Sequence, residues 1–232
     1  VEVKRDGDRL EYSVGVLQPS GAALHRILLL AVCAGEHVPA KTDGARLLIG
    51  AVSEVCRFVS NVVAIKELNW TELRRPKRLE KQVRLLPDAS NLVPLLLQLT
   101  SGRPAQQVEE TLRRLGYVSM SFPATEDGRI YLRLTRIDGT AAAQPAIPAG
   151  AFKALAVETA LMMRPTLIAV DSFDCGLDPD LQQYMLDRLA NSGAYVVITT
   201  SSERVLERAK KTGAVVELRL EDGETKAAAQ PL

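Results

Sequence analysis

Apolar and polar residues alternate at the start of the chain, a pattern typical of β-strands. The alternation runs on both sides of Asp6-Gly7, a dipeptide that tolerates positive φ in a tight turn, and it predicts a β-hairpin over residues 1–16. Apolar residues at helical spacing then predict helices over 22–34 and 45–60. A short apolar run within 61–68 predicts the next strand.

The middle of the chain carries signals for both helices and hairpins. It is expected to form, in order, a helix capped by Ser90 or Asn91 that ends near Leu99, a helix over 104–115 that stops at Gly116, a hairpin that pairs 117–122 with 129–136 about Asp127-Gly128, and a loop of small residues and prolines over 141–148. Pro94 fits the first of these helices, because the first turn has no intrahelical N–H to lose.

From Gly150 onward helices and strands alternate. The expected elements are, in order, a helix over 151–164, a strand over 167–170, a helix over 179–192, a strand over 195–199, a helix over 203–212 and a strand over 214–220. Apolar strands linked by single helices predict a parallel sheet covered by helices on both sides. We therefore expect an α/β fold in two domains, an arm- or lid-like α+β region with hairpins over 1–140 and a βαβ lobe over 141–232.

Composition excludes several classes of protein. The 232 residues are 47% apolar and 25% charged with a formal net charge of +1, which excludes a disordered chain or a polyelectrolyte. Cys33, Cys56 and Cys175 are far apart and accompany only two histidines, so neither a disulfide framework nor a zinc site is expected. The longest apolar run, Ile27 to Ala34, is too short to cross a bilayer. We expect a cytoplasmic protein without a membrane partner.

The strand over 167–170 is followed by an acid. Ligands of open α/β sheets bind beyond the carboxyl ends of the strands, so Asp171-Ser172 and Thr200-Ser201-Ser202 are the residues to inspect for chemistry. A carboxylate at the end of a buried strand is stabilised by a cation, and Mg²⁺ carried by nucleotide phosphates would supply one. The position of Asp171 alone fits a residue that merely caps or turns the chain equally well.

The residues around Asp171 favour its interpretation as an acid that faces Mg²⁺. The run from Leu167 to Pro179, LIAVDSFDCGLDP, resembles the Walker B and D-loop segment of ABC-type ATPases of the SMC and RecF kind. In those proteins four apolar residues, an aspartate and a glutamate are followed by Gly-Leu-Asp-Pro or a close variant. Three further segments agree with the resemblance, which covers about residues 88–220: Asp88–Leu92, Ile147–Phe152 at the signature turn, and Ile198–Ser202 at the switch.

The resemblance implies a P-loop-NTPase-like ABC ATPase head with ATP and Mg²⁺ as cofactors. It implies a homodimer, or a partner ATPase head, as the binding partner. The corresponding catalytic positions are Asp171, which would hold Mg²⁺ through water, together with Ser172, Asp174 and Ser201. The corresponding nucleotide-binding positions are Ala149, Gly150 and Asp178.

The chain departs from the family pattern at several catalytic positions. It contains no G-x-x-x-x-G-K-[ST] phosphate-binding loop, so a Walker A lobe is expected to be absent, removed ahead of Val1 or supplied by another polypeptide. Ser172 stands in place of the glutamate that activates water, with Asp174 as a substitute, and Ser201 stands in place of the switch histidine. Pro148 and Ala149 replace the signature serine, although Gly150 is retained.

Three functions remain open. The first is a degenerate or split nucleotide-binding head that acts as a binding and assembly module. The second is an active, ATP-hydrolysing and DNA-linked ATPase whose Walker A lobe lies in sequence outside this chain. The third is a structural α/β domain whose similarity is topological.

A basic stretch and one cysteine have two interpretations each. The stretch consists of Arg74, Arg75, Lys77, Arg78, Lys81 and Arg84. These side chains fit phosphate contacts to a nucleic acid, or the solvated face of a helix or lid, and the nearest aromatic residue in sequence for stacking is Trp70. Cys175 fits a redox sensor or simply a small residue in a tight turn.

Overall fold

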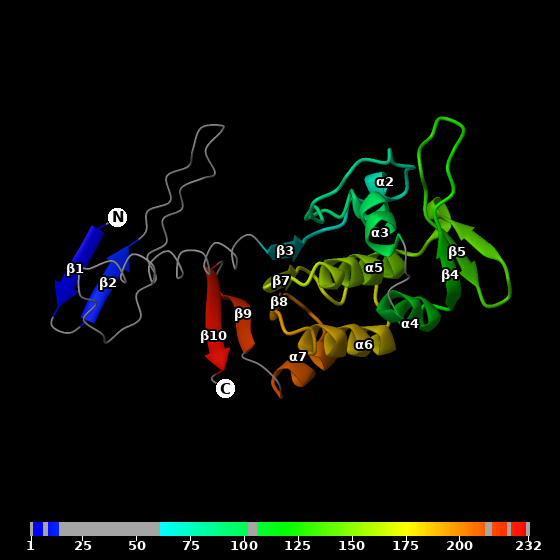
Figure 1. The fold of residues 1–232 in the computed structure, drawn as a ribbon. Helices are drawn as coiled ribbons and strands as arrows, with labels where there is room; N and C mark the ends of the chain where they lie inside the picture. The colour runs from blue at the N-terminus through cyan, green and yellow to red at the C-terminus, as the bar shows by residue number, and fades with distance from the viewer. Residues whose placement is uncertain are drawn as a thin grey trace. The chain divides into compact units, whose positions relative to one another are not determined.

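The computed structural model describes residues 2–6, 9–13, 61–101, 106–211, 215–221 and 224–230. The chain divides into two compact units, Val1–Val62 and Val63–Leu232. The helices expected over 22–34 and 45–60 lie outside the described residues. The first unit contains β1 (Glu2–Asp6) and β2 (Arg9–Ser13), which pair antiparallel with Asp6 opposite Arg9 (Figure 1). The hairpin predicted about Asp6-Gly7 is confirmed.

A three-stranded sheet in the second unit positions the strand ends of interest. Its strands, in spatial order, are β3 (Val62–Ile65), β7 (Leu167–Val170) and β8 (Tyr195–Ile198). β7 and β8 pair in parallel, with α6 (Pro179–Ala190) between them in the chain, so the predicted mixed α/β class with a parallel sheet is confirmed. Tyr195 and Val197 are 71% and 54% exposed, so in the described part helices do not cover both faces of this sheet, contrary to expectation.

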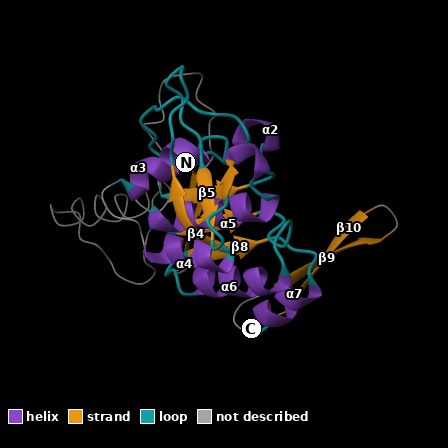
Figure 2. Ribbon diagram, turned by 90° about the vertical axis from the view of Figure 1, so that its right-hand side faces the viewer, coloured by secondary structure: helices purple, strands orange, loops and turns teal. Residues whose placement is uncertain are grey.

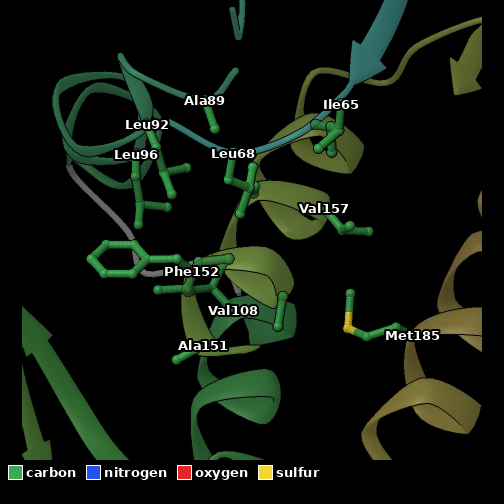
Figure 3. Packing of buried hydrophobic residues seen from close by; sticks show 14 of the residues in the cluster. Ile65, Leu68, Ala89, Leu92, Leu96, Val108, Ala151, Phe152, Val157 and Met185 are labelled. Atoms are coloured by element: carbon green, nitrogen blue, oxygen red, sulfur yellow. The ribbon is translucent and has the colours of Figure 1, made fainter. Parts of the chain in front are cut away.

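One helix, α5 (Ala149–Met162), forms the centre of the second unit's core. The helices that contact it, and that lie around it in Figure 2, are α3 (Leu92–Thr100), α4 (Gln106–Arg114) and α6. Every residue from Gly150 to Ala160 is buried, as is typical of a helix with apolar side chains nearly all round. Figure 3 shows Phe152 of this helix near Leu96 of α3 and Val108 of α4.

A second sheet is antiparallel, and part of it was not expected. Its strands are β4 (Tyr117–Ser121), β5 (Arg133–Arg136) and β6 (Ala141–Ala143). The hairpin of the first two is confirmed, but its second strand begins later than residue 129, because Ile130 makes bridges to Lys77 and Ala124 instead. The prediction of a loop over 141–148 is wrong for its first half. A turn at Asp138-Gly139 brings Ala141–Ala143 alongside β5 as a third strand.

The C-terminal strands form a sheet of their own. β9 (Val215–Glu221) lies where a strand was expected, but it pairs antiparallel with β10 (Glu224–Gln230) rather than extending the parallel sheet. Glu221 stands opposite Glu224 across Asp222-Gly223, a dipeptide that favours a tight turn. α7 (Glu203–Ala209) precedes these strands.

The division expected at residue 140 does not coincide with the boundary between the compact units, because α3 and α4 pack on α5 across it. The arm- or lid-like role of residues 1–140 stays a prediction. Among the residues described, no helix has both the length and the apolar character needed to span a bilayer.

Candidate functional site

The carboxyl ends of β7 and β8 lie side by side and are joined by hydrogen bonds. β7 is the middle strand of its sheet, and Asp171 follows it directly. The Thr199 hydroxyl, one residue past β8, donates to Asp171 Oδ1 at 2.5 Å and accepts from the Ser172 N–H at 2.8 Å. The acid is therefore held at the rim of the sheet.

Asp171 keeps one carboxylate oxygen available. The residue is exposed, and its Oδ2 has no hydrogen-bond partner among residues 61–101 and 106–211. No group of three or more His, Cys, Asp or Glu side chains there is arranged to hold a metal ion. Mg²⁺ is usually bound by one or two carboxylates, water and substrate phosphates, and the water-mediated contact of Asp171 to such an ion stays a prediction.

Ser172 lies in a strained conformation at the same edge. Its φ is +47°, in the left-handed region that L-residues with a side chain rarely adopt, and the residue is exposed. The buried ring of Phe173 follows it, and the Phe173 N–H donates to the Thr199 carbonyl at 2.8 Å. The turn is thus fixed on both sides of Ser172, whose hydroxyl has no partner in the described chain.

Asp174 links the turn after β7 to the segment after β8. Its Oδ1 accepts hydrogen bonds from the Thr200 hydroxyl at 2.5 Å and the Ser201 N–H at 3.1 Å, and its Oδ2 accepts from the Ser201 hydroxyl at 3.0 Å. Partial burial raises the pKa of this carboxyl, but the hydrogen bonds from Thr200 and Ser201 outweigh it and hold the pKa below the usual value. A carboxylate so occupied is a weak proton acceptor near neutral pH.

Sequence reasoning missed Lys153, a buried cation beneath this turn. The residue lies on α5, is only 4% exposed, and its Nζ donates to the Asp171 carbonyl at 2.7 Å. Burial lowers the pKa of the Lys153 ammonium, while Cys175, Asp171 and Asp174 act in the opposite direction. The available signal was a single lysine inside an apolar helix, since a buried charge needs a partner.

The start of α5 packs tightly against the same turn. A Cβ at Gly150 would stand 2.1 Å from the Gly176 carbonyl oxygen, and Gly176 has φ +77°. Gly150 is therefore required for this close approach, whatever else it does. Ala149 lies beside it, with its Cβ 3.6 Å from where a Cβ on Gly176 would be.

Asp178 acts as the N-cap of α6. Its Oδ1 accepts from the N–H groups of Asp180 and Leu181 at 3.0 and 2.9 Å, as the sequence predicted for an acid before Pro179. This cap and Asp174 fix both ends of the turn. The role of Asp178 as a nucleotide contact stays a prediction.

The Asp88–Leu92 segment is also built from side-chain bonds to the backbone. Asp88 Oδ1 accepts from the N–H and hydroxyl of Ser90, and Asn91 Oδ1 accepts from the Leu86 N–H. Asn91 immediately precedes α3, but its side chain holds the preceding loop instead of capping the helix.

The structure brings most of the predicted site residues together. Asp171, Ser172, Asp174 and Ser201 lie in one hydrogen-bonded cluster, with Gly150 and Ala149 against the adjoining turn. The basic stretch is not part of it, because none of its side-chain hydrogen bonds or ion pairs within the described chain reaches these residues. Cys175 is an exposed free thiol in that turn, and no disulfide partner is described.

Comparison with known proteins gives structural likeness only. No family model and no curated protein sequence matches this chain. An Smc head domain with coiled coil and joint from Pyrococcus yayanosii aligns over 82% of this chain and 32% of its own, with 10% identity and a TM-score of 0.45.

Two other solved structures are similar at the same level. A structure from work on ATP-driven dimerization and DNA-stimulated activation of SMC ATPases aligns over 54% of this chain and 86% of its own, with 13% identity and a TM-score of 0.40. An Smc head bound to the C-terminal domain of ScpA, from Pyrococcus furiosus, aligns over 59% of this chain and 34% of its own, with 13% identity and a TM-score of 0.42. This chain thus spans about a third of the first structure's length, and these values assign it neither a family nor a partner.

Proposed function

We propose that this protein is a nucleotide-binding head of the ABC ATPase type that has lost the groups needed for hydrolysis and acts as a binding and assembly module. The observation that carries the proposal is the edge where β7 and β8 end. There the acid that would face Mg²⁺ is present and accessible, whereas a serine occupies the position of the water-activating glutamate.

Retention of the acid supports contact with a nucleotide. Asp171 lies at the end of the middle strand, where α/β sheets bind ligands, with one oxygen directed to no protein donor in the described chain. ATP and Mg²⁺ are the cofactors such an acid would serve. The ion would be reached through water, and Mg²⁺ would supply charge neutralisation for the phosphates.

Loss of the proton acceptor argues against hydrolysis. The Ser172 hydroxyl cannot accept a proton from water near neutral pH without a neighbouring base. Asp174 is the nearest candidate, but its oxygens are engaged by Thr200 and Ser201, and its pKa is held low. Ser201, the counterpart of the switch histidine, is itself occupied by Asp174. In this proposal Ser172, Asp174 and Ser201 therefore position the turn and have no catalytic role.

We infer that residues 16–23 are a degenerate counterpart of the phosphate-binding loop. Residues 16–23, VLQPSGAA, have the spacing of G-x-x-x-x-G-K-[ST] and lie between β2 and a stretch of helical periodicity. Gly21 is the one specified position that is kept. Val16 stands in place of the first glycine, and Ala22 and Ala23 stand where the motif has the lysine for the β- and γ-phosphates and the hydroxyl for Mg²⁺. The stretch lies outside the described residues. A degenerate loop within this chain fits a degenerate head rather than one whose lobe is encoded elsewhere.

The test is calorimetric titration of the full chain with Mg-ATP, with turnover measured in parallel. We expect no turnover and an affinity weaker than micromolar, because the lysine contact is absent. Ser172→Glu is expected to restore no turnover by itself. Micromolar binding with turnover that Asp171→Ala abolishes would overturn the proposal in favour of an active ATPase.

Assembly is tested separately by sedimentation with and without Mg-ATP. A head that acts by docking is expected to form a homodimer, or a complex with a partner head, that does not need hydrolysis. An Asp171→Ala chain should assemble as the unaltered chain does if nucleotide is dispensable. A chain that stays monomeric and binds no partner head under either condition contradicts the assembly role.

A further inference from the structure

Residues 74–86, which follow α2 (Trp70–Leu73) and form the first part of its connection to α3, are here termed the basic loop. Four of its cations, Arg74, Arg78, Lys81 and Arg84, are exposed and have no side-chain hydrogen bond or ion pair within the described chain. Elsewhere on the described surface arginines are commonly paired, as in the ion pairs of Arg113 with Glu109, Arg129 with Asp127 and Arg208 with Asp187. Unpaired positive charge is therefore concentrated on this loop.

The same loop exposes aliphatic side chains. Leu79 is 62% exposed, Val83 84% and Leu86 39%, and these are three of the eight large apolar side chains that the described residues expose. Scattered apolar residues on a surface need no explanation, but a group within eight positions does. The loop thus offers apolar surface flanked by positive charge.

Backbone contacts hold the start of the basic loop in place. Lys77 and Ile130 exchange both backbone hydrogen bonds, at 2.8 and 2.7 Å. The Gln144 side chain donates to the carbonyls of Leu73 and Arg75, and Lys77 is fixed further by its ion pair with Glu72.

Amide side chains hold the rest of it. The Gln98 side chain exchanges two hydrogen bonds with the Gln82 backbone, at 3.0 and 2.9 Å. Asn91 donates to the Arg84 carbonyl at 2.8 Å and accepts from the Leu86 N–H at 2.9 Å. The backbone is therefore anchored on both sides of Leu79 and Val83, which lie exposed between these contacts. Their exposure is built into the fold.

We propose that the basic loop is a docking surface for an acidic segment of a partner protein that carries aliphatic side chains. Such a segment complements both properties, because its carboxylates pair with the free cations and its aliphatic groups cover Leu79 and Val83. A nucleic acid would use the cations alone. Bases stack on exposed aromatic faces. Trp70, the nearest aromatic residue in sequence, is partly buried and packs against the core, and Tyr131, which follows the Ile130 paired with Lys77, is also partly buried.

The proposal does not rest on the proposed nucleotide-binding function. None of the residues it uses belongs to the cluster around Asp171 and Asp174, so either idea can fail alone. Charge sets the rate and salt dependence of such an encounter, while the apolar contacts give it selectivity.

The experiment measures binding of two fluorescent synthetic peptides of equal length and charge to the full chain. One consists of glutamate and leucine, and the other has serine in place of each leucine. We expect the leucine peptide to bind about tenfold or more tightly than the serine peptide, the factor that corresponds to about 1.4 kcal/mol. The combined change Leu79→Ser and Val83→Ser should remove that difference. The combined change Arg78→Glu and Lys81→Glu should abolish binding of both.

Matched controls lie outside the loop. Ile137→Ser alters an apolar side chain that is 75% exposed, and Lys211→Glu reverses an exposed charge. Both should leave the affinities unchanged. All substituted side chains are exposed, so circular dichroism is expected to show an unaltered fold.

Three results would overturn the proposal. Equal affinity for the two peptides would remove the aliphatic contribution. Tighter binding of a DNA oligonucleotide of equal charge, unaffected by the Leu79 and Val83 changes, would assign the loop to nucleic acid. Preferential binding to phosphatidylserine vesicles, lost with the Leu79 and Val83 changes, would assign it to an anionic lipid surface.

Discussion

Gly150 is the residue whose local environment leaves least room for change. Replacing a helical glycine with alanine in open surroundings raises stability by roughly 0.5–1 kcal/mol. Here the added Cβ would meet the Gly176 carbonyl oxygen at 2.1 Å, so the backbone of one segment must move. We expect Gly150→Ala to lower the free energy of unfolding by about 1–3 kcal/mol, measured by urea denaturation. An unfolding free energy that is unchanged or increased in Gly150→Ala would show that the segments containing Gly150 and Gly176 do not approach closely.

Asp174 makes stability depend on pH. Its pKa in the folded chain is held below the usual aspartate value, which the unfolded chain retains, so its contribution is complete above about pH 5. The contribution is lost as the pH falls through the lower, folded value. We expect the unfolding free energy of the unaltered chain to exceed that of Asp174→Asn at neutral pH, and the difference to shrink below about pH 4. A difference independent of pH would contradict this, and Asp180→Asn, at a 96% exposed carboxylate, is the control.

The predictability of single residues depended on whether their partners were local. Asp171 and Asp178 were found because a strand end and a helix start fix their roles within a few residues. The bonds of Asp174 to Thr200 and Ser201 join positions 26 and 27 residues apart, and no periodicity predicts such a pairing. Lys153 was missed for the same reason, since its partner is a carbonyl 18 residues away.

At the scale of elements, strong periodicity was reliable and small residues were misleading. β7 and the start of α6 lie where apolar runs and a cap placed them. Small residues and prolines predict a loop over 141–148, yet β6 needs only backbone pairing with β5 after the turn at Asp138-Gly139. For β9 the apolar pattern predicted the strand correctly, but it did not predict that the strand pairs with β10.

An ion pair joins α5 to α6 and predicts how firmly these helices hold together. Glu158 is fully buried, and Arg188 donates to both of its oxygens at 3.0 Å, while the Thr111 hydroxyl donates to Oε1. Removing one partner of a buried pair leaves an uncompensated charge. The Arg188 side chain is 28% exposed and the Thr111 hydroxyl still donates to Glu158 in the variant, so we expect Arg188→Met to cost less than the roughly 3–5 kcal/mol of a fully buried pair, measured as unfolding free energy in chemical denaturation.

The companion substitution tests the cause of that loss. The double change Glu158→Met and Arg188→Met should recover most of the stability, because no charge is then left buried. Arg188→Lys, which keeps the charge but not the two parallel bonds, should fall between. A double variant no more stable than Arg188→Met would show that the loss comes from packing.

The core of the second unit surrounds one helix, and this arrangement predicts the order in which the molecule opens. Amides that open only with global unfolding lie in elements with the most buried contacts, while edge elements open locally. α5 is buried along Gly150–Ala160 and contacts α3, α4 and α6, whereas β8 exposes Tyr195 and Val197. In hydrogen exchange of the whole chain, we expect the amides of α5 and β7 to exchange most slowly and those of β8 and α7 faster. Exchange of α5 as fast as that of β8 would contradict a core organised around this helix.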